Sequence, residues 1–149
     1  MRIAAVIFSA ALTLNPATAS PSVEEVFRAF GLFGTWAVDC KQPARIANPR
    51  ISITAPNAGT VLEDHDLGSG VARNRYSVLS AQRVSATRLS VAVTFQPGAG
   101  GEERQKLAFL IRNGTRRTMF NQPEGGPVRV LDGVALAQGV KTPVLRKCE

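Results

Sequence analysis

The sequence predicts an all-β protein, a single antiparallel barrel of about eight strands with one short helix near its N-terminus. Apolar and polar residues alternate most regularly over residues 89–95, which is the pattern of a half-buried strand. Two dipeptides, Asn113-Gly114 and Asp132-Gly133, have the composition of two-residue hairpin turns. Helical periodicity is confined to the residues before Gly31. Strand-like runs at this spacing are typical of a barrel, with a two-sheet sandwich as the alternative.

The N-terminus has the features of a secretory signal peptide. Arg2 supplies a positive charge, residues 3–14 are apolar, and Ala17-Thr18-Ala19 provides the small residues that signal peptidase recognises. The apolar run of about 12 residues is shorter than the roughly 20 that a membrane-spanning helix needs. We therefore expect a signal peptide over residues 1–19, a single β-barrel domain without a membrane span over residues 20–149, and a bacterial periplasmic or secreted location.

A short helix is predicted over residues 23–30. Ser22 and Glu25 have the spacing of a capping box, in which the serine caps the first turn and the glutamate reaches back to the serine amide. Four apolar residues then recur at the spacing of one helical face: Val23, Val26, Phe27 and Phe30. Gly31 follows at the position where a left-handed residue commonly ends a helix.

The strands that follow are recognised by alternation and by the turn residues between them. Residues 35–40 place Trp36, Val38 and Cys40 on one face of the first strand. Shorter alternating runs separated by Asn, Gly and Pro predict the next three strands: residues 51–53, 60–65 and 73–79. A hairpin at Asp132-Gly133 is predicted to join residues 128–131 to residues 134–137.

The hairpin at Asn113-Gly114 can be placed in register. Counting outward from the turn gives three pairs: Arg112 with Thr115, Phe109 with Thr118, and Leu107 with Phe120. The apolar face of this hairpin continues that of the alternating strand before it. We predict that the two together line the barrel interior and any ligand held there, through Val91, Val93, Phe95, Leu107, Phe109, Ile111 and Phe120.

The two cysteines, Cys40 and Cys148, are predicted to form a disulfide. An exported chain meets an oxidising compartment, where a lone pair of cysteines usually forms a bridge. Their separation is not the CxxC spacing of a redox enzyme. A catalytic thiol and a bond between two chains are the alternatives.

Gly34-Thr35-Trp36 follows the short helix at the start of the first strand. This order, leading into an eight-strand meander, resembles the lipocalins and the wider calycin group. The resemblance implies that Trp36 packs at the closed end of the barrel beneath a basic residue of the last segment, which in this sequence is Arg146. It also implies that this end is plugged by Phe27, Phe30 and Phe33.

Three groups of secreted proteins share this outline and imply different functions. Avidin-like barrels hold their ligand with several tryptophans, whereas this chain has one. Small periplasmic inhibitors of metalloproteases also run from a short helix into Gly-x-Trp, with cysteines closer together than Cys40 and Cys148. Invasion-associated envelope proteins of α-proteobacteria carry a stretch similar to Gly34–Cys40.

The best candidate for a metal site is the run Glu63, Asp64, His65 and Asp66. Such oxygen-rich clusters are the ligands that hard cations prefer, and glycines follow in the next turn. On a strand, however, Asp64 and Asp66 point away from Glu63 and His65, so the four side chains cannot converge without a bend. We predict a solvated hairpin at this run, with no metal and no cofactor.

Charge and composition argue against several classes of function. The net charge is +7, but the arginines are spread singly with few aromatic residues between them, so no nucleic-acid partner is expected. The chain has a single histidine and no nucleophile or phosphate-binding motif, which predicts that it is not an enzyme. We expect a monomer.

Two functions remain. The first is a periplasmic binding protein that holds a small apolar or amphipathic ligand inside the barrel, which the closed barrel and its apolar face favour. The alternative is a protein-interaction module of the cell envelope, similar to a protease inhibitor or an envelope-associated factor, with a solid, ligand-free barrel. Specificity would then lie on loops such as Ala44–Pro49 and Pro97–Gly101. The volume of the barrel interior separates the two hypotheses.

Overall fold

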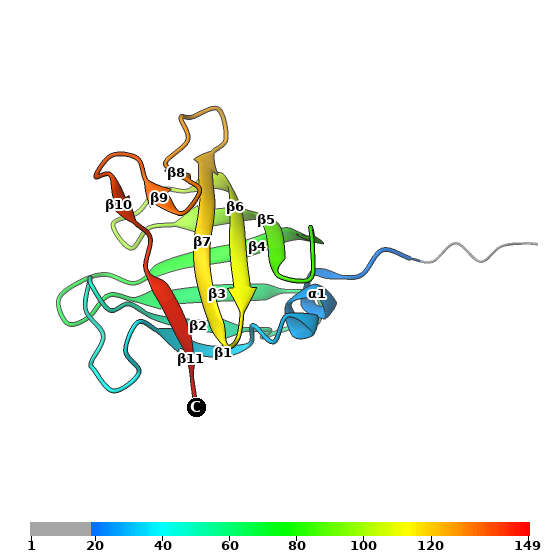
Figure 1. Ribbon diagram of the computed structural model, residues 1–149, viewed down its shortest axis with the longest axis horizontal. Helices are drawn as coiled ribbons and strands as arrows, with labels where there is room; N and C mark the ends of the chain where they lie inside the picture. Colours follow the sequence, from blue (N-terminus) through cyan, green and yellow to red (C-terminus); the bar gives the residue numbers. More distant parts are fainter. Residues whose placement is uncertain (1–18) are drawn as a thin grey trace, which may run out of the picture.

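The computed structural model describes residues 19–149, which form a closed antiparallel β-barrel (Figure 1). Eight strands make up its wall: β1 (Gly34–Ala37), β2 (Arg50–Thr54), β3 (Val61–Asp66), β4 (Asn74–Arg83), β5 (Arg88–Gln96), β6 (Glu103–Arg112), β7 (Thr115–Pro123) and β11 (Val144–Cys148). The predicted all-β barrel is confirmed, in place of the sandwich alternative. The signal peptide predicted for residues 1–19 lies, up to residue 18, outside the described residues.

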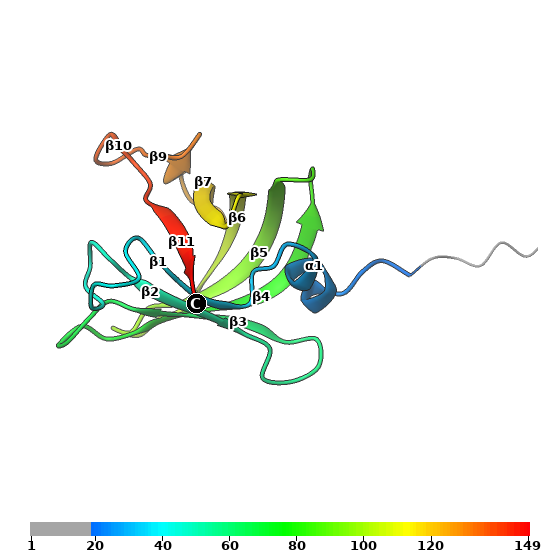
Figure 2. The same ribbon diagram turned by 60° about the horizontal axis from the view of Figure 1, so that its bottom comes forward.

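The barrel is closed by its last strand. Strands β1 to β7 pair in chain order as an antiparallel meander. Strand β11 lies between β7 and β1 and pairs with both, which closes the barrel. Three two-residue strands extend from the side of β7: β8 (Val130–Leu131), β9 (Val134–Ala135) and β10 (Val140–Lys141). They belong to the stretch between β7 and β11, here called the β7–β11 segment (residues 124–143). Figures 1 and 2 both show this segment away from the side on which the helix lies.

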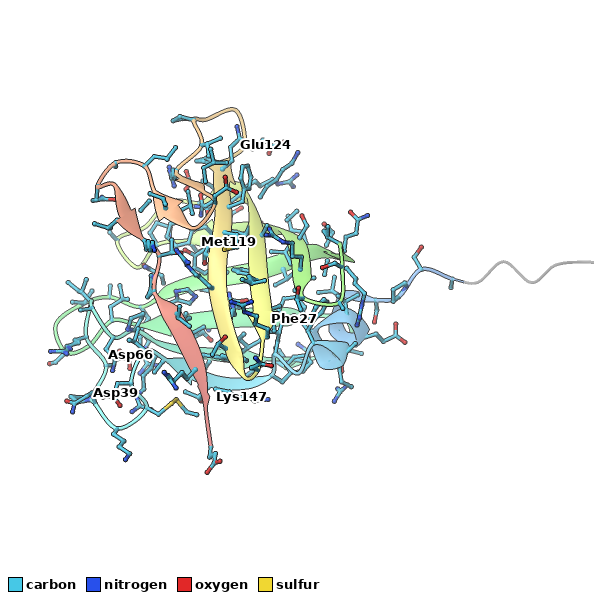
Figure 3. All side chains as sticks on the ribbon, viewed as in Figure 1. Phe27, Asp39, Asp66, Met119, Glu124 and Lys147 are labelled. Carbon is cyan, nitrogen blue, oxygen red and sulfur yellow. A yellow bond between two sulfur atoms is a disulfide. The ribbon has the colours of Figure 1, made fainter. Side chains whose placement is uncertain are left out.

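Helix α1 (Val23–Ala29) covers one end of the barrel. Its capping box is formed as predicted, because Ser22 N donates to Glu25 Oε2 over 2.7 Å and Glu25 N donates to Ser22 Oγ over 3.2 Å. Phe27 is fully buried on the side of α1 that faces the strands (Figure 3). Phe30 and Phe33 pack against the same core while staying partly exposed. Within residues 19–149, no helix is long and apolar enough to cross a membrane.

Trp36 is buried beside this helix, as expected, with 1% of its surface exposed. Its indole Nε1 donates to the Leu32 carbonyl over 2.7 Å. The basic residue at its ring is Lys147, whose Nζ lies 6.0 Å from the ring centroid, so the assignment of Arg146 to this role is wrong (Figure 3). Trp36 pairs directly with Lys147 across β1 and β11, and because successive residues of a strand alternate, Arg146 points to the opposite, exposed face.

The predicted disulfide between Cys40 and Cys148 is present. It joins the chain just after β1 to the last residue of β11, and these two strands are neighbours in the barrel wall. The bridged residues are 108 positions apart in the sequence. A disulfide of this kind fits an oxidising compartment such as the periplasm or the extracellular space.

Both predicted hairpin turns are confirmed. Asn113 and Gly114 have φ values of 52° and 67°, and Asp132 and Gly133 have values of 48° and 74°, which is the pair of positive angles that a type I′ turn requires. The strands beside the second turn are shorter than the predicted residues 128–131 and 134–137, because only two residues on each side pair.

Farther from the first turn, the predicted pairing of Leu107 with Phe120 is wrong. Leu107 pairs with Asn121 and Phe120 pairs with Ala108, because β7 contains one extra residue, Met119, at a β-bulge (Figure 3). The carbonyl of Met119 accepts a hydrogen bond of 3.0 Å from the β8–β9 turn instead. Since side chains alternate along a strand, the bulge turns Phe120 away from the barrel interior and brings Asn121 into it.

Candidate functional site

The barrel interior changes from apolar to polar with distance from α1. Next to the helix lies what we call the sealed half, defined by the buried side chains of Phe27, Leu32, Trp36, Ile53, Val61, Leu89 and Ile111. Beyond it lies what we call the pocket half, defined by the inward side chains of Glu63, His65, Tyr76, Gln105, Arg116 and Asn121. Strand β3 shows the change within five residues, because Val61 belongs to the sealed half and His65 to the pocket half.

The pocket half contains a cavity of about 210 Å³. Its apolar lining comes mainly from Ile51, Leu107, Phe109, Val130, Pro143 and Leu145, and its polar lining from the charged and amide groups of the pocket half together with Thr118 and Thr142. An eight-strand barrel has an interior that side chains alone can just fill. Here they leave a space large enough for a small molecule.

A larger hollow of about 830 Å³ lies outside the barrel, between residues 19–21, α1 and the end of β4. It is a groove along the surface rather than part of the interior. None of its lining residues carries a buried polar atom that lacks a partner among the described residues. The cavity of the pocket half is therefore the better candidate for a binding site, although it is smaller.

A buried ion pair forms the centre of the pocket half. Arg116 on β7 donates from Nη2 to Glu63 Oε2 on β3 over 2.8 Å, and the two side chains are only 3% and 5% exposed. The guanidinium carbon of Arg116 also lies 4.0 Å from the centroid of the Phe109 ring, which is a cation–π contact. Burial alone raises the pKa of the Glu63 carboxyl, but the charge of Arg116 and the nearby His65 outweigh it and lower this pKa to about 2.

Three rings extend from this pair along β3, β4 and β5. His65 Nε2 lies 3.5 Å from Glu63 Oε2, which is too long for a strong hydrogen bond but close enough for electrostatic attraction. The His65 ring lies 4.7 Å from that of Tyr76, which in turn stacks on Phe95 at 4.6 Å between centroids. Burial, together with the negative charge of Glu63, raises the pKa of Tyr76 to about 12.

Several buried polar atoms of the pocket half have no hydrogen-bond partner among the described residues. They are Nε and Nη1 of Arg116, Nε2 of His65 and Oδ1 of Asn121. Buried polar groups in folded proteins are nearly always hydrogen-bonded, because leaving one unpaired costs about 1–3 kcal/mol. Four such atoms in one small cavity therefore indicate a site that is completed by something other than this chain's own side chains.

The β7–β11 segment borders the same cavity and is tied down around it. Thr142 Oγ1 donates to the Thr118 carbonyl over 2.6 Å, which places Thr142 and Pro143 in the cavity lining. Arg129 forms a two-pronged ion pair with Glu103 on β6, over 2.5 and 3.1 Å. From Arg117 on β7, Nη2 donates to the carbonyl of the β8–β9 turn over 2.6 Å. The cavity is thus bounded by the barrel wall and by this anchored segment.

The residues predicted to line a ligand site fall into three groups. Leu107 and Phe109 do line the cavity. Buried in the core instead are Val91, Val93 and Ile111, whereas Phe95 is half-buried and stacks on Tyr76. Phe120 is the one prediction that the structure contradicts, since the bulge at Met119 places it on the face opposite Leu107.

The acidic run of β3 is divided between the two faces of the sheet, as alternation requires. Glu63 and His65 point into the barrel, while Asp64 pairs with Arg75 over 2.7 Å on the outside. Asp66 also lies outside, 3.3 Å from an arginine of the next turn. Among residues 19–149 no three His, Cys, Asp or Glu side chains are grouped as metal ligands. The four side chains of the run are instead divided between the two faces of the sheet and have different partners there.

Sequence reasoning missed Arg116, Tyr76 and Asn121 as site residues. A signal for Arg116 was present, because the same register that pairs Phe109 with Thr118 also pairs Arg116 with Ile111 on the apolar face. An arginine on the inward face of a predicted barrel needs a buried acceptor. Asn121 carries no such signal, since only the bulge brings it inside.

Comparison with protein-family models, curated proteins and solved structures finds no match to this chain. The eight-strand barrel with one short helix is consistent with a lipocalin-like fold. Function has to be inferred from the geometry of the pocket half.

Proposed function

We propose that this protein is an exported binding protein that holds a small amphipathic ligand in the pocket half of its barrel. The observation that carries this proposal is the cavity of about 210 Å³ with one apolar and one polar lining. Small-molecule sites typically combine apolar walls with a few placed polar groups that fix the ligand's orientation. A molecule with a hydrocarbon part and one polar end matches this division.

The polar groups of the pocket are held in place before any ligand arrives. Arg116 is fixed by its hydrogen bond to Glu63 and by the Phe109 ring beneath it. Asn121 is fixed by its own amide, which donates from Nδ2 to Gln105 Oε1 over 3.0 Å. Preorganised groups lose little conformational entropy on binding, so a small ligand can be held by few contacts.

The proposed location follows from the disulfide and from the predicted signal peptide together. The Cys40–Cys148 bond fits the periplasm or the extracellular space, and a small barrel that binds a ligand there would act as a carrier or scavenger rather than as an enzyme. N-terminal sequencing of the protein recovered from the periplasm is expected to begin at Ser20. A chain that retains residues 1–19 in the cytoplasm would contradict this part of the proposal.

Native mass spectrometry of protein purified from its own periplasm tests the ligand directly. We expect a fraction of the molecules to carry a small non-covalent adduct, because a cavity of about 210 Å³ holds only a small molecule. The adduct should disappear in a variant whose cavity is filled, Leu107→Phe, in which the larger ring occupies the ligand space. Leu79→Phe is the matched control, since Leu79 is 49% exposed on the barrel wall.

Loss of the adduct in Leu107→Phe with retention in Leu79→Phe supports binding inside the barrel. An adduct that survives in both variants would place the ligand elsewhere. Absence of any adduct in the unmodified chain, together with failure of the small probes described below to shift pocket resonances, would overturn the proposal and favour the protein-interaction hypothesis.

A second function, interaction with an envelope protein, is supported by the loop between β1 and β2. Asn48 is 2% exposed and holds this loop rigid, because its side chain bonds to the main chain at Asp39, Gln42 and Pro43. At the tip of the loop Ile46 is 74% exposed. A rigid loop that presents a large apolar side chain is a common way to contact another protein.

Site-specific photo-cross-linking tests this second function. A cross-linker at position 46 is expected to capture a discrete envelope protein in living cells, whereas the same group at Asn57, on the exposed β2–β3 turn, is not. An equal pattern from both positions would mean that the loop tip has no specific partner.

A further inference from the structure

We infer that the ligand of the pocket half is a small monocarboxylate, bound through oxygen atoms by the guanidinium of Arg116; this deepens the proposed function and rests on it. The starting point is the set of unpaired atoms. Arg116 is 3% exposed, and its Nε and Nη1 have no acceptor among the described residues. An arginine cannot lose its proton in a protein, so these N–H groups remain donors at every pH of interest.

The pocket offers more unpaired donors than acceptors. The two Arg116 nitrogens can only donate, His65 Nε2 can donate in one of its forms, and Asn121 Oδ1 is the one unpaired acceptor. A ligand end that consists of oxygen acceptors satisfies most of these groups. A carboxylate also gains from the positive charge of the guanidinium, since hydrogen bonds between charged partners are about twice as strong as neutral ones.

Glu63 is the group that opposes an anion in this pocket. Its carboxylate lines the cavity and stays ionised, because Arg116 lowers its pKa to about 2. Its charge is balanced by Arg116 at 2.8 Å, which leaves the pair neutral as a whole. A cationic ligand end would face the fixed guanidinium and would leave the donors unpaired, so the balance of charge and hydrogen bonding favours an acid over an amine.

The size of the cavity limits the hydrocarbon part. A protein cavity of about 150 Å³ is enough to hold benzene, and the cavity here is about 210 Å³. The remainder leaves room for little more than one carboxylate group. An acid with one aromatic ring, or with a chain of roughly six carbons, therefore fits, while a long-chain fatty acid does not. The apolar side chains that line the cavity, and that would contact the acid's hydrocarbon part, include those of Ile51, Leu107 and Leu145.

A series of matched probes tests the ligand class by calorimetry and by NMR on the full exported chain. Benzoate and hexanoate represent the aromatic and aliphatic acids, benzamide is the neutral analogue, benzylamine is the cation, and palmitate is too long. We expect benzoate or hexanoate to bind on the order of tenfold to a hundredfold more tightly than benzamide, with shifts at Tyr76 and His65, and benzylamine and palmitate not to enter. Whichever of the two acids binds more tightly shows whether the hydrocarbon part of the natural ligand is aromatic or aliphatic.

The outcomes separate this inference from the proposed function. If benzamide binds in the pocket as tightly as benzoate, or if benzylamine binds more tightly, the acid preference is overturned while the binding function stands. If no probe shifts the pocket resonances, the inference fails, and the proposed function fails with it provided that native protein also carries no adduct.

Two substitutions sharpen the assignment to Arg116. Arg116→Lys keeps the charge but removes the planar set of donors, and we expect it to weaken benzoate binding about tenfold or more. Arg75→Lys is the matched control, because Arg75 makes the equivalent ion pair with Asp64 on the outer face. Glu63→Gln removes the opposing negative charge without changing the shape of the side chain. Benzoate should therefore bind more tightly to this variant, while the affinity for benzamide should stay the same. A Glu63→Gln variant with unaltered affinity for benzoate would overturn the inference even if Arg116→Lys does not fold.

Discussion

The sealed half and the pocket half of this barrel are built from the same strands but do different work. In the sealed half Phe27, Leu32 and Trp36 are almost completely buried, and they pack in a cluster of buried apolar side chains. In the pocket half Arg116 and Glu63 are buried to a similar degree, yet Arg116 itself and its neighbours His65 and Asn121 carry polar atoms that have no partner within residues 19–149. The difference is that one end of the barrel is packed with apolar side chains, while the other, where we propose that a ligand binds, holds polar groups that the described residues leave unpaired.

Burial of side chains contributes differently to the free energy of folding in the two halves. Each large apolar side chain that is fully buried contributes about 1.5–3 kcal/mol to folding. A buried ion pair is close to neutral at best, because the loss of hydration offsets the attraction between the charges. The sealed half therefore supplies the stability that allows the pocket half to keep unpaired donors.

The largest expected effect comes from removing the centre of the sealed half. Trp36→Ala should lower the free energy of unfolding by about 3–5 kcal/mol, since it empties the largest buried side chain. In the pocket half Thr118→Ala, at the cavity wall, should lower it by about 1 kcal/mol or less. Urea unfolding followed by circular dichroism measures both. Equal losses would mean that the two halves do not differ in packing.

Breaking the ion pair of the pocket half should have nearly as large an effect, and one that can be reversed. Arg116→Met leaves Glu63 buried without a partner and is expected to lose about 3–5 kcal/mol. The double variant Arg116→Met, Glu63→Leu should recover most of this loss or exceed the original stability, because both charges are gone. A double variant as unstable as the single one would show that the pair has a structural role that apolar side chains cannot replace.

Acid should weaken the pocket half through Glu63. The pKa of Glu63 is about 2 in the folded protein against 4.5 ordinarily, which corresponds to roughly 3 kcal/mol of stability. Because the folded pKa is the lower one, this contribution is fully present above pH 4.5 and is lost as the pH falls through 2. Urea unfolding between pH 6 and pH 2 measures it. The Glu63→Gln variant should show a flatter profile than Asp64→Asn, whose carboxylate lies on the outer face; identical profiles would contradict the assignment.

The smallest expected effect concerns the helix alone. Ser22→Ala removes one partner of the capping box and should lower stability by about 1 kcal/mol. Faster amide exchange should then be confined to α1 and its contacts, with benzoate affinity unchanged. A loss of affinity in this variant would show that the sealed end and the pocket are coupled.

Much of the sealed half could be predicted from the sequence because its signals are local. The capping box at Ser22 and Glu25, the alternation along β5 and the turn at Asn113-Gly114 each depend on a few adjacent residues. The disulfide could also be predicted, since only two cysteines are present.

The pocket half could not be predicted because it depends on exact register between distant segments. One extra residue, Met119, exchanges Phe120 for Asn121 on the inner face, and nothing in the local composition marks it. The same dependence on register explains why Lys147, rather than the predicted Arg146, lies beside Trp36. The partner of Arg116 lies 53 positions earlier, on a strand whose alternation could be predicted but whose position across the barrel from β7 could not.

The position of β11 has a consequence for how the chain matures. Because β11 lies between β7 and β1, the barrel wall stays open until β11 has joined it, and the disulfide to Cys40 links this closing strand to the chain just after β1. Closure of the wall and formation of the disulfide therefore depend on the same segment, residues 144–148, and the disulfide also needs an oxidising environment. The order of the strands thus couples the last step of barrel closure to the oxidation of two cysteines.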